Sequence, residues 1–310
     1  MRKSIIIFCA LLFSMPVISQ ELVEKSKDFQ KQFKEVAKDL PLKKDTTYWL
    51  NEGEFSIQFN QVSFSNWAAG GDNSYAAVVG LNYAMNYTKD KSVWANQFVF
   101  SYGMQNQDGD LRKTDDKIDI ASKYGYRINK KANLGVLFSL RSQFTKGYNY
   151  PNTDTYVSKF AAPLYIGLGP GIDYKPNKYL SMFFAPTTMQ WVIISDDYLS
   201  NLGVFGNAPG EKVRTQFGAA LTMQLNKEIA KNMKVNTKLV LFSDYLNNPQ
   251  NIIVNWDFVL DMKVNSFISA KITTGLIYDD NIIINDEDGN PLGPRIQFKE
   301  MFGAGLSVKL

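Results

Sequence analysis

The sequence contains no histidine, and its one cysteine, Cys9, lies within the first twenty residues. Without histidine, Ser-His-Asp hydrolysis, imidazole metal sites and a histidine general base are excluded. Because no cysteine follows Cys9, the rest of the chain has neither a disulfide framework nor a thiolate metal site. The sequence therefore predicts no enzyme, no catalytic residues, no metal site and no cofactor.

After the N-terminus, the sequence also lacks a run of 18 consecutive apolar residues, so it predicts no transmembrane helix. Neither sign of charge is in excess. Without Arg2 and Lys3, 32 basic and 30 acidic residues remain, which argues against a nucleic-acid partner. Aromatic residues are abundant, at 14% of the chain. An exported, aromatic-rich chain without spanning helices can still occupy a membrane as a closed β-barrel.

Export is predicted by the opening stretch, MRKSIIIFCALLFSMPVISQ. Arg2 and Lys3 form a positive region, Ser4 to Val17 is apolar, and small residues precede Gln20. This pattern is typical of a secretory signal peptide, here residues 1–19.

Residues 20–47 differ from the rest of the chain. Apolar residues fall at helical spacing among many lysines and glutamates, and Pro41 ends the run; they are Leu22, Phe29, Phe33, Val36 and Leu40. The pattern predicts a periplasmic amphipathic helix or linker. Two roles are open for it, a solvated tether and a helix that docks under the barrel or onto a partner.

From Gly53 onward the apolar residues recur with a period of two, as in half-buried β-strands. Trp256, Phe258 and Leu260, for example, alternate with Asp257 and Asp261. Twelve such segments are predicted within 48–310: 53–65, 74–87, 93–104, 113–128, 132–146, 158–175, 179–194, 211–226, 232–245, 251–264, 266–279 and 295–310.

The lengths of the connections favour one architecture. Every second connection is short, as in "TKDKS", "NKK", "PNK" and "NKEIA", whereas the others are mostly longer, as in "NWAAGGDN", "QNQDGDLR" and "SDDYLSNLGVFGNAPG". A soluble β-sandwich has no reason to sort its loops in this way, but an outer-membrane barrel has short turns at one end and long loops at the other. The prediction is therefore an all-β fold, a transmembrane antiparallel up-and-down barrel of about 12 strands, with a short N-terminal amphipathic helix.

Aromatic residues gather near both sets of connections, as expected for the two interfacial girdles of such a barrel. Near the short turns stand Tyr87, Trp94, Tyr126, Tyr174 and Tyr179, and near the long loops stand Trp67, Tyr75, Tyr102, Tyr148, Tyr150 and Tyr245. The alternating end, Phe302 to Leu310, resembles the C-terminal strand signal of bacterial outer-membrane proteins.

One predicted loop carries a compact motif, "QVSFSNWAAGGDNS". Its notable residues are Asn66, Trp67, Gly70, Gly71 and Asn73. Paired glycines favour a tight reversal, and a tryptophan there suits a membrane boundary. The motif is interpreted as a turn at the outer interface, and a substrate or partner role for this loop is the alternative.

Together with this motif, "RKTDDKIDIASKYGY", "RSQFTKGYNYP" and "SKFAAPLYIGLGPGIDYKPN" follow in order along the chain. Over about Trp49 to Leu310 the sequence resembles an uncharacterised outer-membrane β-barrel family of Bacteroidota, a domain-of-unknown-function family. The resemblance implies a signal peptide, an outer-membrane location and a barrel. It implies no activity and no catalytic residues.

If the apolar members of each strand face lipid, the opposite set lines the lumen. The predicted lumen-lining cations are Lys117, Lys123, Arg127, Arg141, Lys212, Arg214, Lys234, Lys238, Lys263 and Lys271, and the predicted anions are Asp119, Asp173, Asp257 and Asp261. Two outcomes are open. The excess of cations could attract anions along an open path, or the long side chains could pair across the barrel and fill it.

These patterns predict an integral protein of the cell outer membrane, a solute channel with a basic lumen. The alternative is a non-conducting barrel that serves as a scaffold or assembly subunit of an outer-membrane complex. The predicted partners are outer-membrane lipid and other envelope proteins, the latter through residues 20–47 or the long loops.

Overall fold

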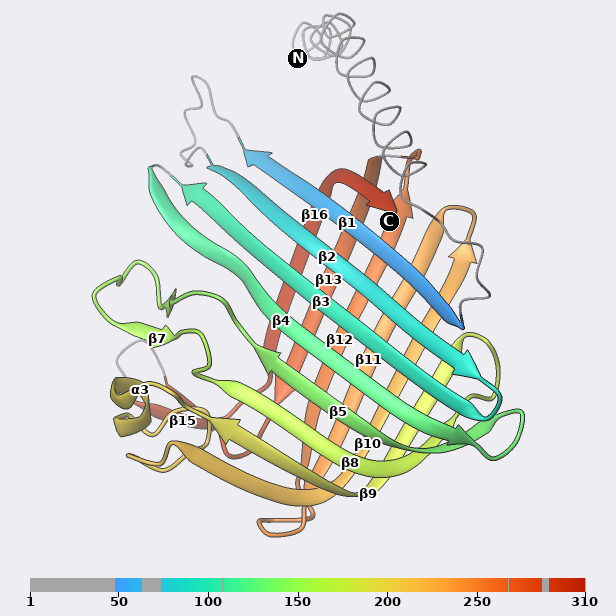
Figure 1. Cartoon of the computed structure of the whole chain (residues 1–310). Helices are drawn as coiled ribbons and strands as arrows, with labels where there is room; N and C mark the ends of the chain where they lie inside the picture. The colour runs from blue at the N-terminus through green and yellow to red at the C-terminus, as the bar shows by residue number, and fades with distance from the viewer. Residues whose placement is uncertain (1–47, 63–73, 108, 267, 286–289, 310) are drawn as a thin grey trace, which may run out of the picture. The chain divides into compact units, whose positions relative to one another are not determined.

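The computed structural model describes residues 48–62, 74–107, 109–266, 268–285 and 290–309. Twelve strands of these residues form a closed antiparallel barrel (Figure 1), in the order β1-β16-β13-β12-β11-β10-β9-β8-β5-β4-β3-β2. The predicted fold class is confirmed. The predicted signal peptide, the predicted helix within 20–47 and the loop motif at 66–73 lie outside the described residues.

The barrel strands are β1 (Trp49–Val62), β2 (Ser74–Lys89), β3 (Ser92–Gln107), β4 (Asp110–Arg127), β5 (Ala132–Ser142), β8 (Leu164–Tyr174), β9 (Leu180–Ile193), β10 (Val213–Ala230), β11 (Met233–Asp244), β12 (Ile252–Lys263), β13 (Ile268–Tyr278) and β16 (Gln297–Lys309). The loops hold the short elements β6 (Gly147–Tyr148), β7 (Tyr156–Ser158), α3 (Asp197–Asn201), β14 (Ile283–Asn285) and β15 (Pro291–Pro294). No helix within the described ranges is long and apolar enough to cross a bilayer.

Every predicted strand overlaps one barrel strand, but some boundaries were wrong. Residues 105–112 were predicted to be a long loop, whereas β3 and β4 continue through them to a tight turn. Gly109 supplies the positive φ of 96° that this turn requires, and its N–H donates to the Asn106 side chain at 3.2 Å. Residues 226–230 were predicted to be a turn, yet β10 extends to Ala230 and reverses only at Lys231 and Asn232.

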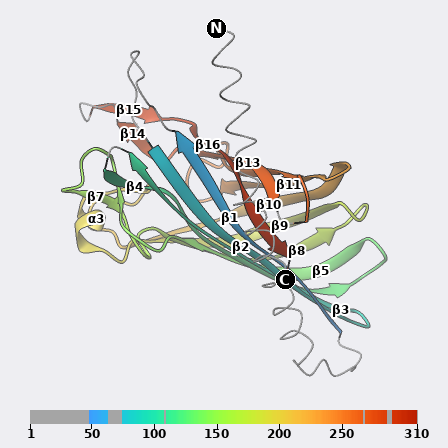
Figure 2. The same cartoon turned by 90° about the horizontal axis from the view of Figure 1, so that it is seen from above.

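The connections define two ends of the barrel. The short-turn end carries the reversals at 90–91, 128–131, 175–179 and 231–232, and the long-loop end carries the connections that hold α3, β7, β14 and β15. In both Figure 1 and Figure 2 these small elements gather at one end. Because the strand number is even, β1 begins and β16 ends at the short-turn end.

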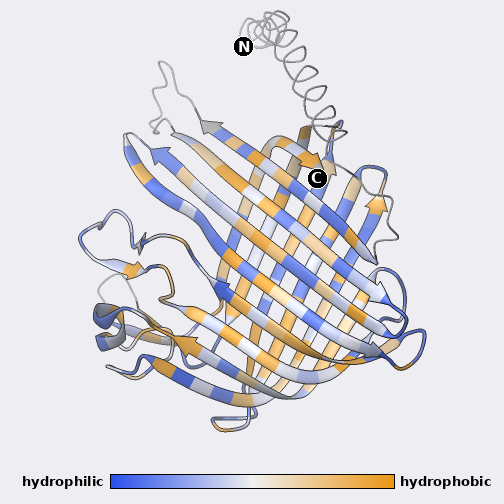
Figure 3. Ribbon diagram, in the orientation of Figure 1, coloured by the Kyte–Doolittle hydropathy of each residue, from blue (hydrophilic) through white to orange (hydrophobic). Residues whose placement is uncertain are grey.

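Alternation of side chains gives the wall two distinct faces. Along the strands in Figure 3, hydrophobic and hydrophilic residues follow one another closely. Large apolar side chains stay exposed on the outer face, such as Leu134 at 56% and Phe302 at 59%. Monomeric soluble proteins rarely expose so much contiguous apolar surface.

The seam between the first and last strands is short. β1 pairs with β16 from Glu54 opposite Lys309 to Phe59 opposite Ala304, whereas its pairing with β2 runs along its full length, from Trp49 to Val62. Where the backbone pairing ends, the Asn60 side-chain amide donates to the Phe302 carbonyl at 2.8 Å. Beyond this point β16 continues along β13, to Gln297 opposite Ile277.

Candidate lumenal site

A cavity inside the barrel identifies the side chains that face the lumen. Its lining includes Asp119 of β4, Lys238 of β11 and Asn255 of β12. Because successive side chains of a strand point to opposite faces, Lys117 and Asp257 belong to the same inner face. Trp256 and Phe258, which alternate with them, belong to the outer face.

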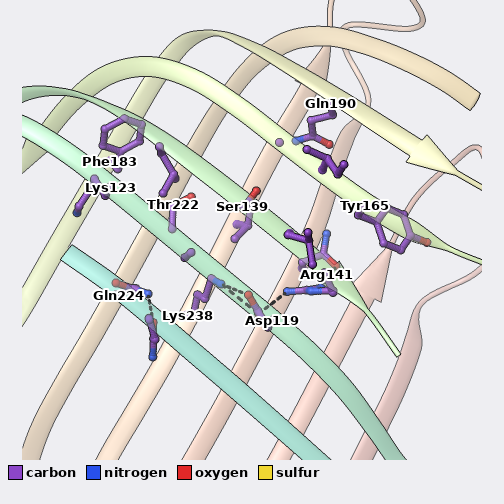
Figure 4. A pocket seen from close by; sticks show the side chains of 18 of the residues that line it. Asp119, Lys123, Ser139, Arg141, Tyr165, Phe183, Gln190, Thr222, Gln224 and Lys238 are labelled. Carbon is purple, nitrogen blue, oxygen red and sulfur yellow. Dashed lines mark hydrogen bonds and ion pairs between the residues drawn. The ribbon is translucent and has the colours of Figure 1, made fainter. Parts of the chain in front are cut away.

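Asp119 is the centre of a charged cluster that crosses the lumen. Its carboxylate lies 3.2 Å from Lys238 Nζ, 3.4 Å from Arg141 Nη2 and 3.9 Å from Lys117 Nζ. Arg141 belongs to β5, which is next to β4, but Lys238 belongs to β11, which is not a neighbour of β4 in the strand order. The contact between Asp119 and Lys238 therefore spans the interior of the barrel (Figure 4).

Asp257 extends this cluster to the opposite wall. It lies 2.9 Å from Lys117 Nζ and 3.6 Å from Arg141 Nη2, and Arg141 Nη1 donates to the Asn255 side chain at 3.0 Å. β4 and β12 lie opposite each other in the closed strand order, so these contacts cross the barrel from wall to wall. We call the five residues Lys117, Asp119, Arg141, Lys238 and Asp257 the transverse bridge.

The transverse bridge contains three cations and two carboxylates, so it carries one net positive charge. Asp119 is only 6% exposed. Removing one partner from a buried ion pair leaves an uncompensated charge, which costs about 3–5 kcal/mol. The bridge thus fixes the distance between walls that share no backbone hydrogen bonds.

Nearer the short-turn end, Asp173 of β8 organises a second group. It accepts from Lys123 Nζ at 2.6 Å and from the Ser181 hydroxyl at 2.9 Å, and it lies 3.5 Å from Lys175 Nζ. Asn133 donates to its other oxygen at 3.2 Å. These contacts connect β4, β5, β8 and β9 on one side of the lumen.

Three more ion pairs lie in the interior. Lys271 contacts Glu54, Lys299 Nζ lies 2.7 Å from Asp115, and Arg214 Nη2 lies 3.8 Å from Asp279. In all of these groups together, eight cations contact six carboxylates. The ion-paired groups therefore carry a small excess of positive charge, and most of their charge is neutralised by pairing.

Beside the transverse bridge lies a cavity of about 400 Å³. Its lining comes from every barrel strand except β1 and β16, and Asp119, Arg141 and Lys238 are part of it (Figure 4). It reaches from Asn86 and Lys175 near the short-turn end to Asp279 and Ile282 beyond the last residue of β13.

Glycines on β8 allow the cavity wall to pack closely. A Cβ at Gly167 would lie 2.6 Å from the Ser139 hydroxyl, and one at Gly169 would lie 2.5 Å from the Thr188 hydroxyl. Side chains at these positions would collide with the neighbouring strands. The sequence GLGPG, residues 167–171, is therefore a place of close approach between strands.

At the long-loop end, the connection from β9 to β10 packs into a small core. Ala162, Ile194 and Leu199 are fully buried together, with Tyr156, Val204 and Phe205 against them. Arg214, on the inner face of β10, donates to the Phe205 carbonyl at 3.2 Å. A Cβ at Gly206 would lie 2.9 Å from Cβ of Asn281, which follows β13. Since β10 and β13 are not neighbours, this loop reaches across part of the mouth.

Asp196 holds this loop core together. Its carboxylate accepts from Lys159 Nζ at 2.5 Å, from the Leu199 N–H at 2.9 Å and from the Tyr156 hydroxyl at 3.1 Å. Burial alone would raise the pKa of this carboxyl. The hydrogen bonds from Lys159, Leu199 and Tyr156 outweigh that effect and lower the pKa below its ordinary value.

The structure brings together many residues that the sequence assigned to the lumen. Lys117, Arg141, Lys238 and Asp257 meet in the transverse bridge with Asp119, while Lys123 meets Asp173. Lys271, Lys234 and Lys263 lie on the inner face at the short-turn half, where Lys271 and Lys234 stand opposite Asp261 in register. Arg214 stands opposite Val192, which also lines the cavity.

One predicted residue lies elsewhere. Lys212 precedes β10 and pairs with Asp197 at 2.5 Å, with 55% of its side chain exposed, so it belongs to the loop and not to the inner wall. Arg127, the last residue of β4, is in register with Asn133 and lines a basic hollow at the short-turn rim with Lys130, Lys131 and Lys175.

The sequence interpretation missed several inner residues. Glu54, Asp115 and Asp279 each pair with a lumen cation, and Tyr165, Gln190 and Asn255 line the cavity. Alternation along β12 could have predicted Asn255, because it lies two residues before Asp257 and therefore on the same face of the strand. Asp279 lies just past the end of β13, where alternation gives no signal.

The sequence matches a family described as a protein of unknown function (DUF3078) over residues 59–148, which is less than half of the chain. No curated protein matches it.

Solved structures with a similar fold include the translocator domain of the autotransporter NalP from Neisseria meningitidis, with 8% identity, 94% of this chain and 97% of that chain covered, and a TM-score of 0.35. The NanC porin has 9% identity, 83% and 100% coverage and a TM-score of 0.37. An outer membrane channel from Pseudomonas putida F1 has 11% identity, 84% and 95% coverage and a TM-score of 0.38. At these values none of the likenesses assigns a function to this chain.

We expect Asp119→Asn to lower the free energy of unfolding by about 3–5 kcal/mol, because Lys238, Arg141 and Lys117 lose the carboxylate they share. Urea unfolding of the refolded barrel measures this loss. Asp110→Asn is the matched control, since Asp110 is exposed at the end of a strand and its pair with Arg112 at 3.7 Å should contribute about 0–1 kcal/mol. Equal, small losses in both variants would show that the transverse bridge does not stabilise the barrel.

The lowered pKa of Asp196 predicts an acid-labile loop. Because the folded pKa lies below the ordinary value of 3.8, the ionised carboxylate stabilises the loop core above that pH, and the stabilisation is lost as pH falls through the lower, folded value. Hydrogen exchange of amides 195–204, corrected for intrinsic rates, should therefore show protection that decreases below about pH 4. In Asp196→Asn the protection should no longer change across this range. An unchanged acid dependence in that variant would assign the effect to another group.

Proposed function

We propose that this chain is an integral barrel of the outer membrane that gives small solutes a narrow, anion-preferring path. A membrane location is supported by the apolar outer face, where Leu134, Phe184 and Phe302 are among the exposed side chains. Such a face in water would promote association, whereas in lipid it is stabilising.

Aromatic side chains at the short-turn end support the same location. Trp49 packs on Tyr87 and Trp94, with ring centroids 5.1 and 5.7 Å away. Tyr124 and Tyr126 of β4 are exposed nearby, on the outer face. Amphipathic rings in a band around one end are typical of a membrane interface.

The observation that supports a path for solutes, and not a closed lumen, is the cavity beside the transverse bridge. Its lining joins residues near the short-turn end, such as Lys175, to residues beyond the far end of β13, such as Asp279. A bridge from wall to wall excludes a wide aqueous pore, but the cavity leaves room for small solutes. The small excess of cations favours anions along the path.

The transverse bridge also favours a second candidate, a non-conducting barrel that acts as a scaffold or assembly subunit. Contacts from β4 to β12 occupy the middle of the lumen, and a barrel with a filled interior would carry no current. Its partners would be envelope proteins that bind residues 20–47 or the long loops.

Single-channel recording in planar bilayers separates the two candidates. We expect small current steps and, in a salt gradient, a reversal potential shifted toward the equilibrium potential of the anion. This anion preference should weaken as salt screens the charges of the wall. Lys175→Glu should shift the reversal potential toward cations, because Lys175 lines the cavity at its short-turn end. Lys231→Glu, on the exposed turn after β10, makes the same charge change away from the cavity and should leave selectivity unaltered. Silence from correctly folded barrels would overturn the path and favour the scaffold.

The membrane location has its own test. Phe258 lies on the outer face near the middle of β12, so Phe258→Arg would expose a charge to hydrocarbon at a cost of about 2–4 kcal/mol. We expect a large loss of folding yield in lipid vesicles, with Phe258→Leu close to the unaltered protein. An undiminished yield for the arginine variant would show that this face is not in the bilayer.

A further inference from the structure

The cavity beside the transverse bridge has the size of a small-molecule site. Its volume of about 400 Å³ falls within the range of about 300–1,000 Å³ that is usual for such pockets. Arg141 and Lys238 line it together with residues of β8 and β9 (Figure 4).

The charged part of the lining is basic. Four cations, Lys123, Arg141, Lys175 and Lys238, line the cavity with two carboxylates, Asp119 and Asp279. The cations already contact carboxylates, but three cations of the transverse bridge share only two, so one positive charge there is uncompensated. A bound anion would neutralise it, whereas a bound cation would add to it.

The lining also offers neutral polar groups, some of them beside Arg141. Tyr165, Gln190, Ser139 and Thr222 face the cavity in Figure 4. The Tyr165 hydroxyl and the Gln190 amide make no hydrogen bond within the part of the chain that the structure describes. Polar groups of an interior are usually hydrogen-bonded, so these two are available to a ligand or to water.

Apolar side chains fill the space between these polar groups. Phe183 and Val192 of β9, Val240 of β11 and Ile253 of β12 all line the cavity, together with Leu137 of β5. They would remove an apolar ligand body from water at about 25 cal/mol per Å² buried, whereas an inorganic anion would leave this surface unused.

We infer that this cavity binds small organic anions that have an apolar body and a single carboxylate or similar head group. The head group lies against Arg141 and Lys238, the body lies along Val192 and Ile253, and Gln190 and Tyr165 hydrogen-bond any polar group on the body. The inference deepens the proposed function by naming a class of solute, and it rests on that function in that the solute must enter the lumen.

The experiment is titration calorimetry on the full barrel in lipid nanodiscs with three probes of one shape: 4-phenylbutyrate, 4-phenylbutanol and 4-phenylbutylamine. We expect the carboxylate to bind at least about tenfold more tightly than the alcohol, a difference of about 1.4 kcal/mol, and the amine to bind most weakly. Equal affinity for the three probes, or no binding of the carboxylate, would overturn the inference.

Variants locate the binding site. Lys238→Gln removes the excess charge of the transverse bridge while Arg141 and Lys117 remain on Asp119, so the preference for the carboxylate over the alcohol should fall about tenfold. Lys271→Gln is the matched control, because Lys271 pairs with Glu54 and does not line this cavity. It should keep the preference. Equal loss in both variants would place the anion elsewhere in the lumen.

A second variant tests the binding site without disturbing the ion pairs that stabilise the fold. Gln190→Leu breaks no ion pair, and we expect it to weaken binding of a probe with a polar group on its body, 4-(4-hydroxyphenyl)butyrate, more than that of 4-phenylbutyrate. Equal weakening of both would show that Gln190 does not hydrogen-bond the polar group of the probe. The binding measurement and the current measurement test different claims, so one can fail without the other. An anion-selective current without carboxylate binding rejects the solute class alone, and carboxylate binding without current rejects the path.

Discussion

The interior of this barrel depends on a carboxylate that three strands share. Backbone hydrogen bonds join each strand to its neighbours, but they do not set how far apart opposite walls stand. Asp119 does so by contacting Arg141 on the adjacent strand and Lys238 on the far wall, while Lys117 reaches Asp257. Since Asp119 is only 6% exposed, its ion pairs are constrained more tightly than those of exposed groups. The cavity exists beside this contact because the contact stops the walls from collapsing or separating.

Much of the fold could be predicted because a strand in such a wall has one apolar and one polar face. This constraint is local, so it is visible in the sequence around Trp256 and Phe258 without knowledge of any partner. Partners across the lumen are different. That Lys117 meets Asp257 depends on the closure, tilt and flattening of the whole barrel, and no pattern along either strand encodes it. Alternation also fails where a strand ends, which is why Lys212 was assigned to the wall and Asp279 was not. The turn at Gly109 was placed too broadly because polar residues continue through the ends of β3 and β4.

A path and a filled interior are commonly treated as opposite states of a barrel, yet in the proposed function one set of charges serves both. Long cations reach across the middle of the lumen and close it to large solutes. The glycines of β8 add no free volume, because the Ser139 and Thr188 hydroxyls occupy the space beside Gly167 and Gly169. The loop core around Asp196 lies at the mouth and adds a folded border at the long-loop end.

The short seam between β1 and β16 has a consequence for how the chain assembles. These strands are the furthest apart in sequence of any paired strands in the barrel, so bringing them together closes the largest loop and carries the greatest entropic cost. Hairpins such as β3–β4 and β11–β12 need only local closure, and pairing that spans the chain is the slow kind. If neighbouring hairpins pair in succession, the chain first forms an open, curved sheet. Its two free edges, β1 and β16, then pair last. Because only the stretch from Glu54 to Phe59 aligns with β16, that last step gains few backbone hydrogen bonds, and the ion pair of Lys271 with Glu54 adds a contact from β13 to β1 across the seam.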